Sequence, residues 1–266
     1  MKRKNIFDLT DRVAIVTGGG GGLGRAFCEA MAEFGADVAC VDYDEQKAKE
    51  CVENIKKYKH RAIAIRADIS DFDQVESMVN EILTKMGSID ILFNNAAVTD
   101  LATKLCETPV DVWNRMIRIN LTGVFLCMRA VLPVMVRQKK GSIINISSAG
   151  AFGSTSPTVV PASYGASKAG VISLTRTGAV EYGRDGIRVN CIAPGTHETG
   201  LGVLPDPEEE NKRREHMQNV ANQYIPLGRI ARPDEIKGLA VYLASDASSY
   251  VTGQVFIEDG GWLAQI

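Results

Sequence analysis

Two residues that stand four positions apart could form an acid/base pair. Tyr164 and Lys168 occur in Tyr-Gly-Ala-Ser-Lys, and positions i and i+4 are neighbours on one face of a helix. A free phenol titrates near pH ~10, and a nearby ammonium group favours the phenolate and lowers that pKa. The pair therefore predicts a tyrosine that acts as general acid/base. The alternative interpretation is an ordinary solvated helix face.

A glycine cluster near the N-terminus lies in the setting that dinucleotide binding requires. Residues 13–16 are a short β-branched apolar run that suits a strand buried on both faces. Apolar residues then recur at helical spacing from Leu23 onward. Because Gly18, Gly22 and Gly24 have no side chains, the backbone can approach a pyrophosphate that rests on the helix N-terminus. The alternative, a flexible linker, does not explain the flanking strand and helix.

An acidic residue ends the second predicted strand. Asp42 follows the glycine turn by about twenty positions, where a carboxylate accepts hydrogen bonds from the adenosine ribose hydroxyls. It could instead cap the helix that begins at Glu45, or Asp44 could take that role. The glycine loop contains no basic residue, although Arg25 follows it directly. We therefore expect the extra phosphate of NADP to meet Asp42 without a positive partner, which predicts NAD as the cofactor.

Together with further motifs, these elements resemble the classical short-chain dehydrogenase/reductase family from residue 12 to the C-terminus. The family's Thr-Gly-x-x-x-Gly-x-Gly stands at residues 17–24, and its Asn-Asn-Ala-Gly stands at residues 94–97 with Ala97 in place of the last glycine. The resemblance implies four catalytic residues, which are Asn120, Ser148, Tyr164 and Lys168. It implies cofactor contacts from Thr17, Gly18, Gly22, Leu23, Gly24, Asp42, Asp68, Ile69, Asn95, Ala96, Tyr164, Lys168, Pro194, Gly195 and Thr199.

The resemblance also implies what each catalytic residue does. Tyr164 exchanges the alcohol proton, and Lys168 lowers the pKa of that phenol and hydrogen-bonds the nicotinamide ribose. Ser148, rather than the adjacent Ser147, positions the substrate oxygen; the alternative is a strand-end hydroxyl that satisfies a backbone group. Asn120, at a helix break, holds a water that links Lys168 to solvent.

Strand-like and helix-like segments alternate along the chain. Such alternation predicts a single α/β domain over residues 1–266, a Rossmann-type doubly wound parallel sheet of about seven strands with helices on both faces. A polar, Pro-containing segment at 196–226 fits a substrate lid. The expected strands are 12–17, 37–42, 61–67, 89–93, 142–147, 187–193 and 254–258, and the expected helices are 22–34, 44–58, 71–86, 108–139 with a break near Asn120, 162–182 and 233–244.

The composition agrees with such an enzyme and disfavours other classes. With 45% hydrophobic residues and a formal net charge of −2, the chain can bury a full core and has no basic stripe for nucleic acid. No signal core follows the basic first residues and no long apolar segment predicts a membrane span, so we expect a cytoplasmic protein. The six cysteines lie singly, without a Cys-x-x-Cys pair. This spacing favours reduced, buried thiols over disulfides or metal ligands.

The resemblance further implies a homotetramer with two-fold axes. Helix 162–182 would pack against its symmetry mate through apolar residues and through small residues that allow close approach. The C-terminal tail would form a second contact. The residues expected at these contacts are Val171, Leu174, Val180, Gly170, Ser173, Gly178, Trp262 and Leu263.

The substrate is expected to be a small or medium neutral secondary alcohol, cyclic or polyhydroxylated, or its ketone. His197 and Glu198 would lie near the nicotinamide end of the site, and a partly apolar pocket would be lined by Leu201, Val203, Leu204 and Met217. Residues 206–210 would make the outer lid acidic and disfavour anionic carriers.

Three alternatives stay open. The first is a 3-oxoacyl-(acyl-carrier-protein) reductase, with a basic dock for the carrier at Arg129, Arg137, Lys139 and Lys140. Such reductases generally prefer NADPH and carry a basic residue where Val180 stands. The second is a non-catalytic nucleotide-binding scaffold on the same fold. The third is a lyase or epimerase of the extended branch, whose longer substrate domain this chain lacks.

Overall fold

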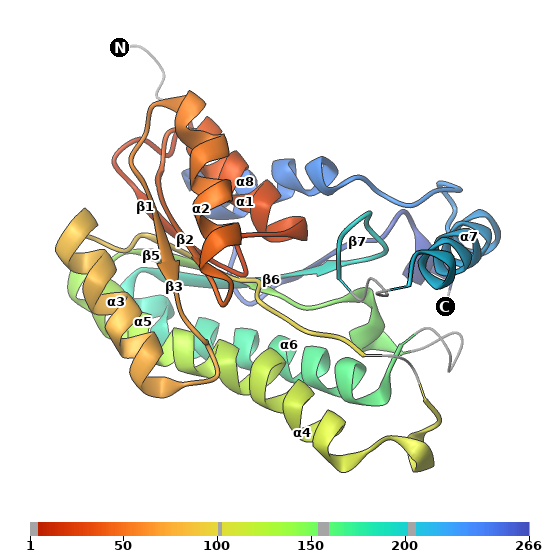
Figure 1. The fold of residues 1–266 in the computed structure, drawn as a ribbon. Helices are drawn as coiled ribbons and strands as arrows, with labels where there is room; N and C mark the ends of the chain where they lie inside the picture. The colour runs from red at the N-terminus through yellow and green to blue at the C-terminus, as the bar shows by residue number, and fades with distance from the viewer. Residues whose placement is uncertain (1–4, 101–102, 154–159, 202–205, 266) are drawn as a thin grey trace.

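The structure is a computed structural model that describes residues 5–100, 103–153, 160–201 and 206–265. Figure 1 shows a central sheet between two layers of helices. One group of sequence predictions, the pocket residues Val203 and Leu204, lies outside the described residues.

Within the described residues, seven strands form one parallel sheet in the order β3-β2-β1-β4-β5-β6-β7. This confirms the predicted fold class. Because β1 has β2 on one side and β4 on the other, the winding reverses between β1 and β4 and opens a crevice at the carboxyl ends of the strands. The strands are β1 (Val13–Thr17), β2 (Asp37–Asp42), β3 (Ala62–Arg66), β4 (Ile91–Asn94), β5 (Gly141–Ile146), β6 (Ile187–Pro194) and β7 (Val255–Glu258).

Helices cover both faces of the sheet, as the alternating sequence pattern predicted. Helices α1, α2 and α8 pack on one face, and α3, α5 and α6 pack on the other (Figure 1). Their bounds are α1 (Gly22–Glu33), α2 (Glu45–Ile55), α3 (Phe72–Met86), α4 (Val110–Ile117), α5 (Gly123–Gln138), α6 (Ala162–Tyr182), α7 (Pro207–Tyr224) and α8 (Lys237–Ala244).

Strand β1 shows how the sheet divides the core in two. Val13 and Ile15 belong to the cluster under α3 and α5, whereas Ala14 and Val16 belong to the cluster under α1 and α8. All four side chains are at most 3% exposed. Alternate side chains of a strand point to opposite faces of the sheet. A strand that is covered on both faces therefore needs apolar residues at every position, which is the continuous apolar run found in the sequence.

The predicted break near Asn120 is a π-helical turn, Arg118–Thr122, between α4 and α5. The combined segment Val110–Gln138 is the one helix of the described chain that is long and apolar enough to cross a membrane. Its most apolar window is 61% buried inside the protein, as expected of a core helix. The sequence therefore does hold one long apolar segment, but its burial differs from that of a span that faces lipid. The burial of the helix explains its composition.

Two of the predicted tetramer contacts on α6 lie inside the protomer instead. Val171 is fully buried in the core, and Gly178 is buried as well. A Cβ atom at Gly178 would lie 2.9 Å from Met128 Cε, so this glycine accommodates a neighbour of the same chain. Gly170 is half-buried beside Leu121, and its approach to a symmetry mate stays a prediction. Val180 is 85% exposed and remains available for such a contact.

Candidate active site

A large cleft runs across the carboxyl ends of the central strands. Its volume is about 1180 Å³, more than a drug-sized ligand requires. Residues at or just after the ends of five strands line it: Gly18, Asp42, Asn95, Ser147 and Pro194. A cleft at the reversal of strand order is where doubly wound sheets bind ligands.

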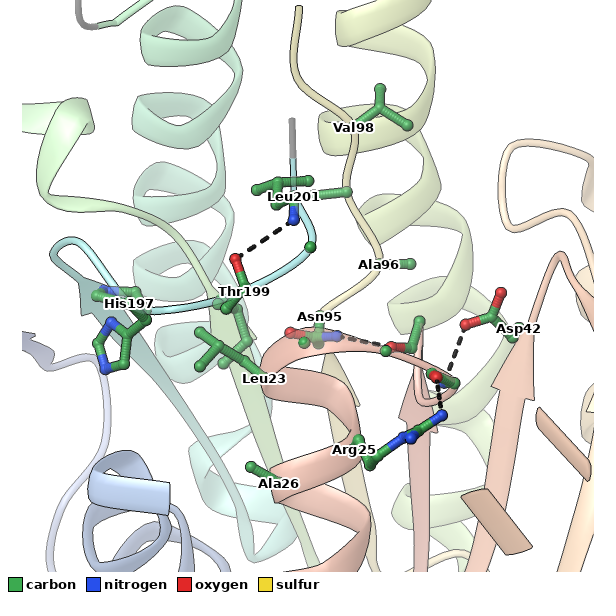
Figure 2. A pocket seen from close by; sticks show the side chains of 18 of the residues that line it. Leu23, Arg25, Ala26, Asp42, Asn95, Ala96, Val98, His197, Thr199 and Leu201 are labelled. Carbon is green, nitrogen blue, oxygen red and sulfur yellow. Dashed lines mark hydrogen bonds between the residues drawn. The ribbon is translucent and has the colours of Figure 1, made fainter. Parts of the chain in front are cut away.

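The glycine turn leaves the start of α1 open toward this cleft (Figure 2). Gly18 has φ +63°, and a Cβ atom there would lie 2.7 Å from Ala96 Cα. A Cβ atom at Gly24 would collide with the Gly18 carbonyl oxygen. Gly21, the N-cap of α1, supplies no side-chain hydrogen bond to the first turn. These uncapped N–H groups and the close backbone fit an anionic group such as a pyrophosphate.

Asp42 lies at the end of β2 beside the glycine turn (Figure 2). Its Oδ2 accepts a hydrogen bond from the Gly20 N–H at 3.0 Å, and its Oδ1 accepts one from the Asp44 N–H at 3.0 Å. Asp44, not Asp42, is the N-cap of α2, because its Oδ1 accepts from Gln46 N and Lys47 N. Of the two predicted alternatives, Asp44 therefore caps α2, and the Asp42 carboxylate faces the cleft.

Two cationic side chains line the cleft near Asp42, and the sequence analysis undervalued both. Arg25 donates a hydrogen bond to the Gly20 carbonyl oxygen at 2.9 Å, and Lys47 is 3.8 Å from its ion-pair partner Asp44. The expectation that a phosphate at Asp42 would find no positive group nearby was therefore wrong. The signal was present in the sequence, because the first turn of α2 must follow β2 and so faces the glycine turn.

Thr17 and Asn95 tie β1 to the segment after β4. The Thr17 Oγ1 accepts from the backbone N–H groups of Asn95 and Ala96 at 3.0 and 3.2 Å. The Asn95 side-chain amide in turn donates to the carbonyl oxygens of Thr17 and Gly18 at 3.0 and 3.1 Å. These bonds fix the glycine turn against Ala96, which lines the cleft. Thr17 itself lies behind the cleft wall, fully buried.

Tyr164, Ser148 and Lys168 line one part of the cleft together. Burial raises the pKa of Tyr164 above its ordinary value, and a hydrogen bond with Ser148 partly offsets that rise. Burial lowers the pKa of Lys168 to about 8. Its Nζ donates to the Ile146 carbonyl oxygen at 2.8 Å and lies 5.7 Å from the centre of the Tyr164 ring. The pKa of Tyr164 is therefore raised, whereas the sequence analysis predicted that Lys168 would lower it, and burial is the main cause of the rise.

Ser147 and Ser148 have different surroundings although they are adjacent. The Ser147 hydroxyl is buried and donates to the Lys168 carbonyl oxygen at 2.8 Å. The Ser148 Oγ accepts from the Gly150 N–H at 3.1 Å and is also hydrogen-bonded to Tyr164. Ser147 therefore holds α6 against the end of β5, whereas Ser148 is the serine that reaches the tyrosine.

Asn120 is fully buried in the π-helical turn, behind the cleft wall. Its Oδ1 accepts from the Val98 N–H at 2.8 Å, and its Nδ2 donates to the Val98 carbonyl oxygen at 2.8 Å. A longer contact of 3.4 Å joins Nδ2 to the Ser167 Oγ, whose hydroxyl donates to the Tyr164 carbonyl oxygen. Asn120 and Ser167 thus connect the segment after β4 to the helical turn that carries Tyr164. The sequence analysis did not single out Ser167.

The segment after β6 reaches back over the glycine turn. Pro194, Gly195 and Thr199 line the cleft, and the Thr199 Cβ is 3.3 Å from where a Cβ atom at Gly22 would stand. Figure 2 shows Thr199 and His197 on this segment opposite Leu23. The His197 ring is almost fully buried, with Nδ1 3.2 Å from the Gly195 carbonyl oxygen.

Asp68 and Ile69 follow β3 and line the cleft beyond Asp42. The Asp68 Oδ1 accepts from the N–H and the hydroxyl of Ser70 at 2.8 and 2.7 Å. All the predicted site residues therefore surround the cleft except three. Thr17, Gly24 and Asn120 lie behind its wall and hold its lining in place.

The predicted acidic outer lid is partly neutralised. Asp206 caps α7 by accepting from the N–H groups of Glu208 and Glu209. Glu210 is buried and bonds with both Arg213 and Arg214. Basic residues one turn later on α7 thus balance part of the acidic charge at residues 206–210.

Comparison with known proteins agrees with this site. The profile of a family described as enoyl-(acyl carrier protein) reductase matches residues 19–263. With the parallel sheet, the glycine turn and the clustered tyrosine and lysine, this match shows that the chain belongs to the short-chain dehydrogenase/reductase family of oxidoreductases. Members of this family use a nicotinamide cofactor.

Three relatives illustrate the range of the family around this chain. Cis-4-hydroxycyclohexanecarboxylate dehydrogenase of Sinomonas cyclohexanicum is 38% identical, covering 96% of this chain and 98% of the relative. A 3-oxoacyl-(acyl-carrier-protein) reductase of Thermotoga maritima is 37% identical, with coverages of 95% and 98%. The crystal structure of a gluconate 5-dehydrogenase from Burkholderia cenocepacia in complex with NADP and tartrate is similar with a TM-score of 0.88, 33% identity and 98% of each chain covered.

Proposed function

We propose that this protein is an NAD(H)-dependent oxidoreductase that interconverts a secondary alcohol and its ketone. One observation carries the proposal: a tyrosine hydrogen-bonded to a serine, with a lysine beside it, lines the same cleft as an uncapped glycine turn and an acidic strand end. The first group can move a proton at a substrate oxygen. The second group fits a dinucleotide with free ribose hydroxyls.

The nicotinamide, when bound, supplies the group that accepts hydride from the alcohol carbon or donates it to the carbonyl carbon. The protein residues supply the rest of the chemistry. Tyr164 Oη takes the hydroxyl proton in oxidation and returns it in reduction. Ser148 Oγ holds the substrate oxygen and stabilises the charge that develops on it. Lys168 keeps positive charge next to the phenol, and Asn120 holds the adjoining backbone and a water that connects Lys168 to solvent.

Asp42 supports NAD rather than NADP as the cofactor. Its carboxylate faces the cleft and would repel a ribose phosphate. Arg25 and Lys47 work against this preference because they line the same part of the cleft. The NADP complex of the similar gluconate 5-dehydrogenase shows that the other choice occurs on this fold. We propose that the protein prefers NAD, but that the ratio of kcat/KM for NAD to kcat/KM for NADP is smaller than an isolated carboxylate would give.

We propose the whole chain, residues 1–266, as one cytoplasmic catalytic domain, with a lid at about 196–226 that covers the substrate. The segment that begins at Thr196 passes over the glycine turn at Thr199. Leu201 lines the cleft and is 42% exposed. A half-exposed apolar side chain at the rim of a cleft suits a segment that closes over an organic substrate.

We further propose a homotetramer. Val180 is 85% exposed on α6, and Phe125 on α5 is 47% exposed. Large apolar side chains on neighbouring helices of one face favour burial against a second copy. Molar mass by light scattering at micromolar concentration tests this, and a monomer would contradict it.

For the substrate, we propose a small or medium cyclic secondary alcohol. The support is the partly apolar rim at Leu201 and the relative whose name gives a hydroxycyclohexane carboxylate as substrate. Because Glu208 and Glu210 are paired with basic residues, the lid repels an anionic substrate less strongly than its sequence implied. A 3-oxoacyl-(acyl-carrier-protein) reductase is the second candidate, which the Thermotoga relative supports.

The deciding experiment is a side-by-side kinetic screen. Neutral cyclic alcohols, their carboxylated forms and 3-hydroxyacyl thioesters are compared with NAD and with NADP, and the dinucleotide absorbance is followed. We expect cyclic alcohols with NAD to give the highest kcat/KM. Thioesters that turn over about a hundredfold more efficiently, a difference of ~3 kcal/mol in transition-state binding, would favour the carrier-protein reductase. Absence of turnover together with tight NAD binding would favour a non-catalytic scaffold.

A further inference from the structure

Three cysteines that are far apart in the sequence meet beneath the glycine turn. Cys28 comes from α1, Cys40 from β2 and Cys51 from α2. Their sulfur atoms all lie within 4.8 Å of one another, and all three residues are fully buried. In the sequence these cysteines are more than ten residues apart and match no short motif, which predicted isolated thiols. The structure corrects that interpretation.

The glycine turn packs directly against this cysteine cluster. The Cys28 Sγ lies 4.0 Å from the Gly19 carbonyl oxygen. A Cβ atom at Gly19 would lie 2.7 Å from the Cys40 Sγ and 3.0 Å from the Cys28 Sγ. The Gly19 backbone thus packs directly against two of the three sulfurs, with no room for a side chain between them.

The spacing suits a metal ion better than it suits a disulfide. Three sulfurs that bind one cation at about 2.3 Å stand about 4 Å apart, so the cluster needs only a small contraction. The Gly19 carbonyl oxygen is within reach as a fourth ligand, which completes the coordination number that zinc prefers. A disulfide would join two of the sulfurs at about 2.05 Å and leave the third without a role.

A positive charge stands beside the cluster, because the Arg25 guanidinium interacts electrostatically with Cys51. The Arg25 Nε is buried without a hydrogen-bond partner. Three thiolates around a divalent cation carry one net negative charge, which that guanidinium can balance.

We propose that Cys28, Cys40 and Cys51 form a binding site for a divalent thiophilic cation, with Zn²⁺ and Cd²⁺ as the matching ions, below the glycine turn. Soft thiolate ligands select such ions over Mg²⁺ or Ca²⁺. Binding displaces the remaining thiol protons, and no electron transfer takes place. The site is separate from the proposed catalytic residues and does not depend on the proposed reaction.

The test uses the full-length protein with Cys106→Ser, which removes the exposed thiol and with it surface binding. The protein is incubated anaerobically with Cd²⁺ and a non-thiol reductant, desalted and analysed for bound metal. The ultraviolet thiolate-to-cadmium absorption is recorded in parallel. A second sample is produced in zinc-supplemented medium and analysed in the same way, because slow opening of a buried site could limit uptake by the folded protein.

We expect one retained cation per chain. Cys51→Ser should abolish retention, whereas Cys127→Ser, which removes a buried cysteine outside the cluster, should leave it unchanged. If Cys51→Ser does not fold, X-ray absorption spectroscopy of the cadmium-loaded parent protein provides the test instead. We expect it to show three sulfur neighbours around the bound cadmium. The absence of stoichiometric metal in both samples, fewer than three sulfur neighbours, or equal loss in Cys127→Ser would overturn the proposal.

Discussion

The Lys168 ammonium donates its hydrogen bond to the Ile146 carbonyl oxygen, 2.8 Å away, rather than to the Tyr164 hydroxyl. Ile146 ends β5 and Lys168 stands one turn after Tyr164 on α6. The bond therefore holds the cleft-lining face of α6 against the carboxyl edge of the sheet. It does so by burying a charge, which is costly unless the charge is compensated.

This burial makes Lys168 a residue that lowers stability at neutral pH. A pKa lowered from 10.5 to about 8 corresponds to ~3 kcal/mol. Because the unfolded chain binds this proton more tightly, the cost is fully present below pH 8 and disappears as the pH rises toward 10.5. We expect Lys168→Met to raise the free energy of unfolding at pH 7 by roughly 1–3 kcal/mol, with a smaller gain at pH 9.5. Urea unfolding at both values measures this, with exposed Lys140→Met as the control.

Tyr164→Phe should remove the proton-transfer group and little else. We expect kcat to fall by ~10²–10⁴-fold, whereas the Kd for NAD changes little because the ring remains. Oxidation needs the phenolate and burial raises the pKa of Tyr164, so kcat/KM for alcohol oxidation should rise with pH in the unmodified enzyme and that for reduction should fall. Steady-state rates and fluorescence titration measure these effects. Activity above about a tenth of the parent value would locate the acid/base elsewhere.

The sheet and the cleft could be predicted because their signals are local. Continuous apolar runs such as residues 13–16 identify strands buried on both faces, and the glycine turn fixes where the first crossover begins. Alternation of strands and helices then allows few topologies. The predicted site residues therefore lay at the cleft or directly behind it.

The errors concern contacts between segments that are distant in sequence. The pKa of Tyr164 depends on how deeply α6 packs, and the role of Gly178 depends on Met128 opposite it. The meeting of Cys28 with Cys51 depends on the register of two helices against one strand. Charge pairing within α7 was within reach of the sequence, because Glu210 and Arg214 have the i, i+4 spacing of a helical ion pair.

Val180→Glu should break one contact of the proposed tetramer. Its side chain is 85% exposed on α6, so the change leaves the protomer core intact. Two like charges facing each other across a two-fold axis repel, and we expect the molar mass by light scattering to fall to that of a dimer. Tyr250→Glu, at a fully exposed position outside α6, is the control and should keep the parent mass. An unchanged mass for Val180→Glu would place the interface on another surface.

Asn120→Ala should weaken the packing between the segment after β4 and the turn of α6 that carries Tyr164. It leaves the N–H and the carbonyl oxygen of Val98 without their side-chain partner, and removing such a partner costs about 1–3 kcal/mol. We expect a lower free energy of unfolding and a lower kcat, because the chain through Ser167 to the Tyr164 backbone is also lost. The control is Asn114→Ala, an exposed asparagine on α4. If both variants lose the same free energy of unfolding in urea, the two hydrogen bonds between Asn120 and Val98 do not stabilise the fold.

Asp42→Ser should narrow the preference for NAD over NADP, which we expect to exceed tenfold in kcat/KM for the unmodified protein. The variant removes the carboxylate that repels the extra phosphate and leaves Arg25 and Lys47 in the cleft to attract it. Adding Lys47→Met to Asp42→Ser should then lower kcat/KM for NADP again while changing that for NAD little. The matched control is Asp44→Ser, which removes a nearby carboxylate while serine can still cap α2, and which should leave the cofactor ratio unchanged.

Comparable kcat/KM with both cofactors in the unmodified protein would contradict the assignment of NAD. No effect of Lys47→Met in the Asp42→Ser background would leave Arg25 as the group that receives the phosphate. Arg25 already bonds with the Gly20 carbonyl oxygen and lies 3.9 Å from Glu50. It would have to give up its weak, half-exposed pairing with Glu50. The combined Asp42→Ser and Glu50→Gln variant would then show a further gain in kcat/KM for NADP.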